Sequence, residues 1–224
     1  MHAVVTGASS GIGAAIATRL LADGWRVTGL SRTRPTIDAR GFAHRSLDLA
    51  NADAASVGAA LEGVAPTALV HAAGVLRVGE LGALNAEAGA AMWRLHVAAA
   101  ALLADALAPR LPDGGRILLI GSRTAQGSAG RSQYAATKAA LMGLARSWAI
   151  ELAPRGVTVN VIAPGATETP MLHDPARAGV MPRRPPSGRF VQPEEIAALA
   201  AFLLSDVARS ITGQQIVVCG GASL

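Results

Sequence analysis

The segment SQYAATKAAL, residues 132–141, contains the only tyrosine and the only lysine of the chain, and all other long cationic side chains are arginines. If this segment is helical, Tyr134 and Lys138 lie four residues apart on one face, so the ammonium can sit beside the phenol. A phenol has an ordinary pKa of ~10, and a nearby positive charge lowers that pKa by favouring the phenolate. The pair therefore has the chemistry of a general acid-base group that works near neutral pH.

A lysine suits this position better than an arginine would. Its compact ammonium carries three hydrogen-bond donors and can reach a ribose diol and a tyrosine together, whereas the planar guanidinium of arginine fits that geometry poorly. Because the chain uses arginine everywhere else, the retained lysine indicates a specific requirement. The alternative is an exposed pair on an ordinary helix, which holds only if the rest of a catalytic site is missing.

A glycine-rich stretch, TGASSGIG at residues 6–13, follows the first apolar run. Gly7, Gly11 and Gly13 in a strand-to-helix turn would let the backbone approach a phosphate, and the helix N-terminus would add free N–H groups and a partial positive charge. The spacing differs from the G-x-G-x-x-G of the common dinucleotide fingerprint. Taken alone, the stretch is equally typical of a plain tight turn.

The end of the second expected strand, LSRTR at residues 30–34, bears on the identity of the ligand. A sheet that binds NAD usually places an acidic residue here, on the ribose 2′-hydroxyl. Ser31 and Arg32 stand there instead, with Arg34 close by, and they suit a 2′-phosphate. NADP(H) is therefore the expected cofactor, and the alternative is that Arg32 is one more solvated surface arginine.

These candidate groups must be positioned by the secondary structure around them. Short aliphatic runs alternate with longer helical patterns, which is typical of stacked βαβ units with a parallel sheet. We expect an α/β fold with residues 1–224 in a single domain: a Rossmann-type doubly wound sheet of seven mostly parallel strands with helices on both faces. The strands are expected in HAVVT, WRVTGL, AHRSLD, TALVHA, RILLIG, VTVNVIA and QQIVVC, and the helices start near Gly11, Asn51, Asn85, Arg131 and Pro193.

Composition and charge narrow the functional classes. A chain of 224 residues with 51% hydrophobic and 16% charged side chains can bury a substantial core. The single cysteine, Cys219, excludes an intramolecular disulfide framework, and MHAVVTG resembles no signal or transit peptide, so a cytoplasmic location is expected. The net charge of +5 is spread along the chain with few aromatic residues, which argues against a nucleic-acid partner. The most apolar stretch, 97–107, is too short to span a membrane, and the histidines lack metal-ligand spacing.

Taken together, the motifs resemble the short-chain dehydrogenase/reductase family, of the compact type that includes the 3-oxoacyl-acyl-carrier-protein reductases. The likeness covers almost the full length, and the order and spacing of the motifs are highly specific. The motifs are TGASSGIG at 6–13, Asp48-Leu49, HAAG at 71–74, IGS at 120–122, YAATK at 134–138, NVIAPGATETPM at 160–171 and the segment from GRF to CGG at 188–221.

The resemblance implies an NADP(H)-dependent oxidoreductase that interconverts a carbonyl and a secondary alcohol by hydride transfer, on a small molecule or a thioester-linked acyl group. It implies that Tyr134 moves the proton, that Lys138 lowers the tyrosine pKa and holds the nicotinamide ribose, and that Ser122 positions the substrate oxygen. It also implies a homodimer or homotetramer. The cofactor groove that it implies is formed by Gly7, Ser9, Ser10, Gly11, Ile12, Gly13, Ser31, Arg32, Asp48, Leu49, Ala73, Gly74, Tyr134, Lys138, Pro164, Gly165, Thr167 and Thr169.

Two histidines depart from the family pattern. His96 stands where the family normally has a catalytic asparagine on the long middle helix. It could replace that asparagine in a water-linked proton relay to Lys138, or it could only fill space and cap a local backbone group. His71 begins HAAG where the family usually has N-N-A-G, a motif thought to brace the sheet.

Other functions stay open at this point. A redox-neutral enzyme of the epimerase or dehydratase type would use His96 as an extra base, whereas a non-catalytic NADP-sensing protein would not need an intact Ser-Tyr-Lys set. Substrate choice is expected to lie in a lid over about 171–190. Its Arg177, Arg183 and Arg184 could meet an anion, although a solvated basic loop is the simpler interpretation.

Overall fold

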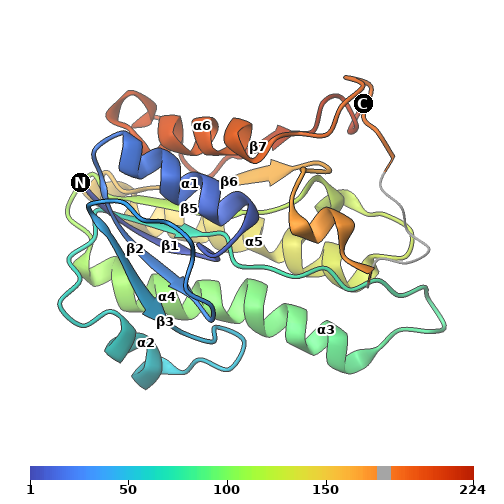
Figure 1. Ribbon diagram of the computed structural model, residues 1–224, viewed down its shortest axis with the longest axis horizontal. Helices are drawn as coiled ribbons and strands as arrows, with labels where there is room; N and C mark the ends of the chain where they lie inside the picture. Colours follow the sequence, from blue (N-terminus) through green and yellow to red (C-terminus); the bar gives the residue numbers. More distant parts are fainter. Residues whose placement is uncertain (176–182) are drawn as a thin grey trace.

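The computed structural model describes residues 1–175 and 183–224, which form a seven-stranded sheet covered by helices (Figure 1). The strand order is β3-β2-β1-β4-β5-β6-β7, and each neighbouring pair is parallel. The expected doubly wound fold is confirmed, with every described strand parallel. The strands are β1 His2–Thr6, β2 Arg26–Ser31, β3 Phe42–Ser46, β4 Ala68–His71, β5 Arg116–Ile120, β6 Thr158–Pro164 and β7 Gln215–Val218.

Helices cover both faces of this sheet, with α1 and α6 on one face and α2, α4 and α5 on the other (Figure 1). The α-helices are α1 Gly11–Ala22, α2 Ala54–Ala60, α3 Ala86–Trp93, α4 Ala99–Leu107, α5 Ser132–Leu152 and α6 Pro193–Leu204. A π-helical turn, η1 Arg94–Ala98, joins α3 to α4. The short 3₁₀ turns are η2 Ala108–Arg110, η3 Arg123–Gln126, η4 Ala153–Arg155, η5 Pro170–His173 and η7 Asp206–Ala208.

Two hydrophobic cores lie on the two faces of the sheet, and alternate residues of one strand contribute to them. Val4 and Leu69 are fully buried in the core beneath α4 and α5, while their neighbours Val5 and Val70 are fully buried beneath α1 and α6. Burial on both faces explains why these strands read as continuous apolar runs. It also makes the central strands a rigid support for the loops at their carboxyl ends.

The chain reverses its winding direction between β1 and β4, which are neighbours at the centre of the sheet. In open α/β sheets such a reversal leaves a crevice outside the carboxyl ends of the strands, where ligands bind. Thr6 ends β1 and His71 ends β4, so the glycine-rich turn and the HAAG turn flank this crevice.

Two helices differ from the sequence expectation. α2 begins at Ala54 rather than near Asn51, because Asp53 caps it: Asp53 Oδ1 accepts from the Ser56 N–H at 2.8 Å, and Ser56 Oγ accepts from the Asp53 N–H at 2.9 Å. The helix expected from Asn85 is interrupted by the π-helical turn η1. Hydrophobic periodicity does not reveal such a turn, which is often found at functional sites.

The helical stretch Ala86–Arg110 is long and apolar enough to cross a membrane by length and composition. In the fold, its residues Leu103 and Leu107 are fully buried, and they pack in the core beneath the sheet. Packing in this core accounts for the buried part of the stretch, which is 44% of its most apolar 18-residue window.

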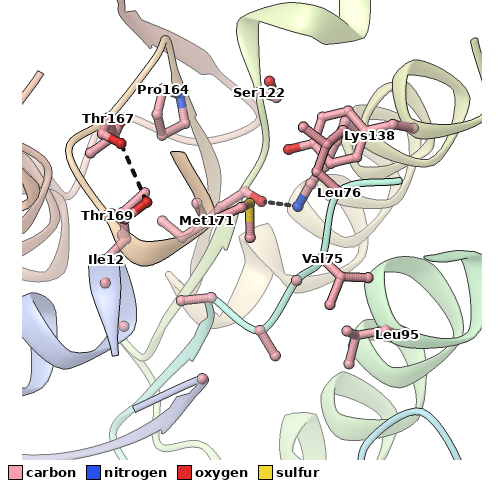
Figure 2. A pocket seen from close by; sticks show the side chains of 18 of the residues that line it. Ile12, Val75, Leu76, Leu95, Ser122, Lys138, Pro164, Thr167, Thr169 and Met171 are labelled. Atoms are coloured by element: carbon pink, nitrogen blue, oxygen red, sulfur yellow. Dashed lines mark hydrogen bonds between the residues drawn. The ribbon is translucent and has the colours of Figure 1, made fainter. Parts of the chain in front are cut away.

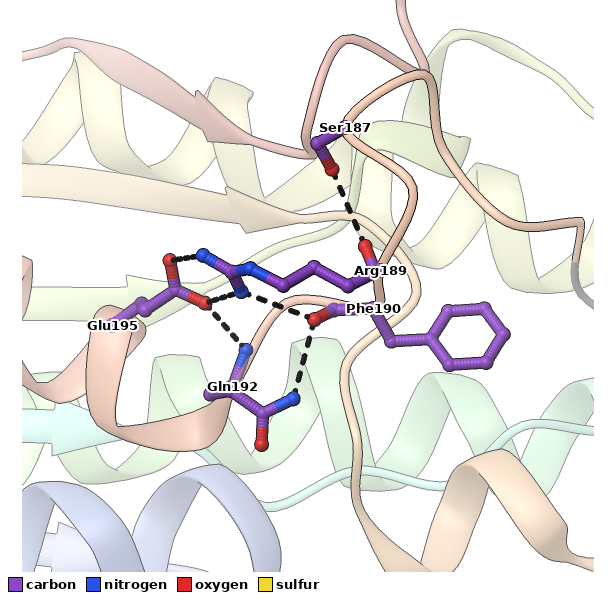
Figure 3. Close-up of polar contacts among 5 residues, drawn as sticks. All are labelled: Ser187, Arg189, Phe190, Gln192 and Glu195. Atoms are coloured by element: carbon purple, nitrogen blue, oxygen red, sulfur yellow. Dashed lines mark hydrogen bonds and ion pairs between the residues drawn. The ribbon is translucent and has the colours of Figure 1, made fainter.

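The start of α6 is fixed by a polar cluster (Figure 3). The Arg189 guanidinium donates to both carboxylate oxygens of Glu195, at 2.6 and 2.9 Å, and Glu195 also accepts from the Gln192 N–H at 2.7 Å. These donors lower the pKa of Glu195 to about 2. The carboxylate therefore anchors the chain between the expected lid and α6 across the whole range of physiological pH.

Candidate active site

A cavity of about 870 Å³ opens at the carboxyl ends of the strands. Every predicted cofactor-binding residue lines it, and so does Ser122. Among the predicted catalytic residues, His96 alone does not line this cavity. Residues far apart in the sequence are thus brought together by the ends of β1, β2, β4, β5 and β6.

Tyr134 and Lys138 lie on the first turns of α5 and share one helix face, as their spacing predicts. Lys138 is 5% exposed; its Nζ donates to Ile120 O at 2.8 Å and lies 5.8 Å from the centroid of the Tyr134 ring (Figure 2). Burial lowers the pKa of the Lys138 ammonium to about 7, because desolvation disfavours the charged form. A protonated Lys138 keeps two further donor hydrogens for groups inside the cavity.

Ser122 follows β5 and is buried at the edge of the same cavity. Its side chain caps η3, since Ser122 Oγ accepts from the Thr124 N–H at 3.1 Å. A hydroxyl that accepts this bond still has its own hydrogen to donate. Ser122 can therefore offer a hydrogen bond to an oxygen bound beside Tyr134.

The glycine-rich turn between β1 and α1 can hold a phosphate. A Cβ on Gly7, where φ is +66°, would lie 2.9 Å from the backbone of Ala73, and one on Gly13 would lie 2.3 Å from Gly7 O, so neither position admits a side chain. Ser10 precedes α1 without a side-chain capping bond. The first N–H groups of α1 are thus left for an anion in the cavity.

The far end of the cavity holds the residues predicted for the adenosine half of the cofactor. Ser31 Oγ donates to Thr33 O at 2.8 Å, and Asp48 accepts from Asn51 Nδ2 at 2.8 Å, so both side chains are oriented. Arg32 lines the cavity, is exposed, and forms no ion pair with the part of the chain that the structure describes. Its guanidinium is available for an anion such as a 2′-phosphate.

The stretch after β6 forms the opposite wall. Thr167 Oγ1 donates to Gly165 O at 3.1 Å, and Thr169 Oγ1 donates to Thr167 O at 3.3 Å, which ties the loop into one conformation (Figure 2). Gly165 packs against Cys219, since a Cβ on Gly165 would lie 2.9 Å from that residue. Cys219 is 9% exposed and acts as a small packing residue behind this wall.

His96 lies behind the cavity rather than in it, and it is fully buried. Its Nε2 accepts from the Val75 N–H at 3.0 Å, its Nδ1 lies 2.8 Å from Thr137 Oγ1, and its ring meets the Tyr134 ring edge-on at 5.6 Å. Burial and the nearby Lys138 lower the pKa of His96 well below its ordinary value. These contacts fit the interpretation in which His96 caps a backbone group, and they occupy both ring nitrogens that a relay would use.

The end of the cavity beside Lys138, the candidate substrate end, contains residues that were not among the predicted site residues. Its apolar lining includes Leu76, which lies beside Lys138, and also Leu95 and Met171 (Figure 2). Two arginines also line it: Arg123 directly follows Ser122, and Arg131 precedes Tyr134 by three residues. Only adjacency in the sequence to the catalytic candidates could have pointed to these arginines.

The two described arginines of the predicted lid differ in where they lie. Arg183 lines the cavity, whereas Arg184 donates to Gly188 O at 3.4 Å and does not line it. Arg177 lies within residues 176–182, outside the described residues. In the part of the chain that is described, no group of three His, Cys, Asp or Glu side chains could hold a metal ion.

Comparison with known proteins identifies the family. Residues 7–223 match the family described as "Enoyl-(Acyl carrier protein) reductase". The chain is 38% identical to the 3-oxoacyl-(acyl-carrier-protein) reductase FabG of Salmonella typhimurium, over 98% of this chain and 96% of that protein. The chain belongs to the short-chain dehydrogenase/reductase family. It is therefore an oxidoreductase by family.

Other members of the short-chain dehydrogenase/reductase family show the breadth of the likeness. The D-threitol dehydrogenase of Mycolicibacterium smegmatis is 34% identical over 99% of this chain and 92% of that protein. The solved structure of a short-chain dehydrogenase from Burkholderia cenocepacia in complex with NADP is 37% identical, with a TM-score of 0.89 over 99% of this chain and 97% of that chain. The fold is thus shared along the whole length with enzymes named for different substrates.

Proposed function

We propose that this protein interconverts a carbonyl compound and a secondary alcohol with NADP(H), and that Tyr134 is the acid-base group. The observation that carries the proposal is the meeting of Ser122, Tyr134 and Lys138 in one cavity with a glycine turn suited to phosphate. A solved relative at 37% identity is a complex with NADP, which supports the same cofactor here.

The cavity residues fit NADP(H) in one orientation along the groove. The glycine turn and the start of α1 would hold the diphosphate, and Arg32 beside Ser31 would hold the 2′-phosphate. Lys138 would hold the nicotinamide ribose, and the loop with Thr167 and Thr169 would hold the carboxamide end. Bound this way, a nicotinamide would give a hydride to a carbonyl carbon or take one from an alcohol carbon.

The protein's own groups would handle the proton and the oxygen. During reduction, the Tyr134 hydroxyl gives its proton to the carbonyl oxygen as that oxygen gains negative charge. The Ser122 hydroxyl donates a hydrogen bond to the same oxygen. The Lys138 ammonium stabilises the phenolate left on Tyr134, and the reverse order of these steps oxidises the alcohol.

The two alternative functions are less well supported by the geometry. A redox-neutral reaction with His96 as an extra base requires that ring to reach the substrate, yet it does not line the cavity and both its nitrogens are hydrogen-bonded. A sensing protein would not require Ser122, Tyr134 and Lys138 to line one cavity. We infer hydride transfer as the function of this site.

The residues at the candidate substrate end of the cavity favour a substrate with two parts: an apolar part, such as an acyl chain, and a negatively charged group. Leu76, Leu95 and Met171 provide apolar contact, and Arg123 lines the cavity without an ion pair to any described residue. A thioester-linked acyl group is one candidate substrate, and the relative FabG is named as a 3-oxoacyl-(acyl-carrier-protein) reductase.

A substrate panel tests the proposed function directly. Ketones, 3-oxoacyl thioesters and secondary alcohols are assayed with NADP(H) and NAD(H), and the absorbance of the reduced nicotinamide is followed. At least one carbonyl compound should be turned over with NADPH, with kcat/KM at least about tenfold lower with NADH. Binding of NADPH without net consumption on any member of the panel would contradict the proposal.

Arg32→Gln should change cofactor preference. Removing one charge-assisted bond to a phosphate costs about 1.5–3 kcal/mol, so the KM for NADPH should rise by roughly 10- to 100-fold while the KM for NADH stays within about twofold. Steady-state kinetics with both cofactors measure this. Arg26→Gln, an exposed change at the opposite end of β2, is the matched control. Equal losses with NADPH and NADH would show that Arg32 does not contact the 2′-phosphate.

We also propose that the chain assembles as a homodimer or homotetramer. α3 and α5 pack together, and each leaves a large apolar side chain exposed that a second copy could cover, Trp93 at 48% and Ile150 at 77%. Light scattering in solution should give a mass of two or four chains. Residues 1–224 then act as one domain in each subunit, with the proposed lid over about 171–190.

A further inference from the structure

Two buried histidines, which the hydride-transfer mechanism does not use, stand directly behind the cavity. His71 ends β4 and His96 lies in η1, and both side chains are 0% exposed. A buried imidazole is stable only when both ring nitrogens find partners. Their partners fix one protonation form for each ring.

His71 is held as a neutral ring with hydrogen on Nε2. Thr6 Oγ1 already accepts from the Ala72 and Ala73 N–H groups, at 3.0 and 2.9 Å, so the one hydrogen of Thr6 Oγ1 goes to His71 Nδ1 at 3.1 Å. His71 Nε2 must then donate, and it lies 3.1 Å from the carbonyl oxygen of Leu95 in η1. Any other proton placement leaves a buried group without a partner.

His96 is held as the opposite tautomer. The Val75 N–H can only donate, so His96 Nε2 carries no hydrogen and accepts this bond at 3.0 Å. The hydrogen is therefore on Nδ1, which donates to Thr137 Oγ1 at 2.8 Å. Thr137 Oγ1 in turn donates to the carbonyl oxygen of Tyr134 at 2.8 Å.

These bonds join three parts of the site in series. The path starts at Thr6 on β1, passes through His71 to η1, continues through His96, and ends at the backbone of Tyr134 through Thr137. Along the way it fixes the N–H groups of Ala72, Ala73 and Val75 in the cofactor turn 72–75. The π-helical turn η1 brings Leu95 O and the His96 ring into the path together.

The charges around the two rings favour the neutral forms. Lys138, Tyr134 and the other histidine are the titratable groups that face them, and no described carboxylate contacts either ring. Gly74 lies next to both His96 Nε2 and Lys138 Nζ, because a Cβ on Gly74 would be 3.2 Å from the first atom and 3.6 Å from the second. Since glycine has no side chain, nothing at this position screens the two nitrogens from each other. A proton on His96 would break the bond from Val75 and place a second cation beside Lys138.

We propose that His71 and His96 are positioning residues, which with Thr6 and Thr137 form a strut of fixed tautomers between the cofactor turn and Tyr134. The strut sets where Tyr134 stands relative to the groove, and it carries no proton during the reaction. The kinetic tests of the strut depend on the proposed function, because they measure kcat. The NMR test of the two tautomers does not depend on it.

The tautomers are tested in the wild-type protein by ¹⁵N NMR of its five histidines, with His71→Asn and His96→Gln used to assign the signals. The expected result is hydrogen on Nε2 of His71 and on Nδ1 of His96, with both patterns unchanged from pH 8 down to pH 5.5. Rapid exchange between tautomers, or protonation of either ring in this range, would overturn the strut even if the protein has no reductase activity.

The link to Tyr134 is tested by Thr137→Val, which keeps the side-chain shape and removes the hydroxyl. Because a misplacement of about 1 Å can cost up to 10²-fold in rate, kcat should fall by roughly 10- to 100-fold while the KM for NADPH changes less than about threefold. Thr137→Ser restores the hydroxyl and should recover most of kcat. Wild-type kcat in Thr137→Val would overturn the proposal.

A proton relay predicts a different pH profile. If His96 carried a proton, kcat of the wild type would show a protonation near the ordinary histidine pKa, about 6.5, that disappears in His96→Gln. The strut predicts the same profile shape in the wild type and in His96→Gln, at a lower kcat in the variant, and any step from Lys138, whose pKa is lowered to about 7, appears in both. A histidine step present in the wild type and absent from the variant would replace the strut with the relay.

Discussion

Tyr134→Phe should abolish turnover while leaving cofactor binding intact. Tyr134 and Ser122 line the same cavity, and in the proposed mechanism the phenol exchanges a proton with the substrate oxygen; a positioned acid-base group contributes on the order of 10²- to 10⁴-fold in rate. We therefore expect kcat to fall by about that factor and the dissociation constant for NADPH to change less than about threefold. Nicotinamide absorbance measures the first quantity and nicotinamide fluorescence the second.

A control on the same helix separates chemistry from folding. Arg146→Gln changes an exposed residue of α5 that does not line the cavity, and it should retain wild-type kinetics. Full activity in Tyr134→Phe would remove the proposed mechanism. Loss of NADPH binding in the same variant would instead assign Tyr134 a binding role.

Lys138→Met should inactivate the enzyme and at the same time stabilise the fold at neutral pH. Lowering a lysine pKa from 10.5 to about 7 corresponds to a folding cost of roughly 5 kcal/mol at pH 7, because the unfolded chain keeps the ammonium solvated. Methionine removes this cost, but it leaves Ile120 O without its hydrogen bond, a loss of about 1–3 kcal/mol. We expect a net gain of about 2–4 kcal/mol in the free energy of unfolding of the cofactor-free protein.

The sign of the effect should change with pH. Between pH 7 and about 10.5 the unfolded lysine binds more protons than the folded one, so the wild-type free energy of unfolding rises with pH across this window. The advantage of Lys138→Met should shrink accordingly and reverse near pH 9. Urea unfolding at pH 7, 8, 9 and 10 measures both curves. A variant less stable than the wild type at pH 7 would contradict the burial cost.

The stability gain and the lost activity have one cause. The buried ammonium lowers stability because it is desolvated, and in the proposed mechanism the same ammonium stabilises the phenolate of Tyr134. Catalytic groups of this kind commonly reduce stability, so the two measurements on Lys138→Met test a single physical statement about the site.

The local pattern of residues was enough to predict the fold and most of the site. Apolar runs such as those around Val4 and Leu69 predict buried parallel strands, because strands covered on both faces must be apolar throughout. Spacing alone predicts that Tyr134 and Lys138 share a helix face, because the helical period is fixed. Motif order then placed the predicted cofactor residues, and all of them line one cavity.

Some boundaries depended on side chains whose role appears only in three dimensions. The start of α2 is set by the cap between Asp53 and Ser56, and the turn η1 interrupts a helix that periodicity predicts to be continuous. Individual hydrogen bonds decide where a helix is capped and where a π-helical turn forms. The pattern of hydrophobic residues gives no information about these bonds.

The sequence by itself predicted the fold class, the pairing of Tyr134 with Lys138 and the phosphate turn, because each follows from local spacing or from a contiguous motif, and the resemblance to the family added Ser122. Only the tertiary structure decided what surrounds these groups: the burial that lowers the pKa of Lys138, the arginine at 123 in the cavity, and the partners of His71 and His96. The partners of the two histidines lie 21 to 65 positions away in the chain, such as Thr6 and Leu95 for His71 or Thr137 for His96. Desolvation and hydrogen-bond partners are set by such neighbours, and a linear pattern does not contain them.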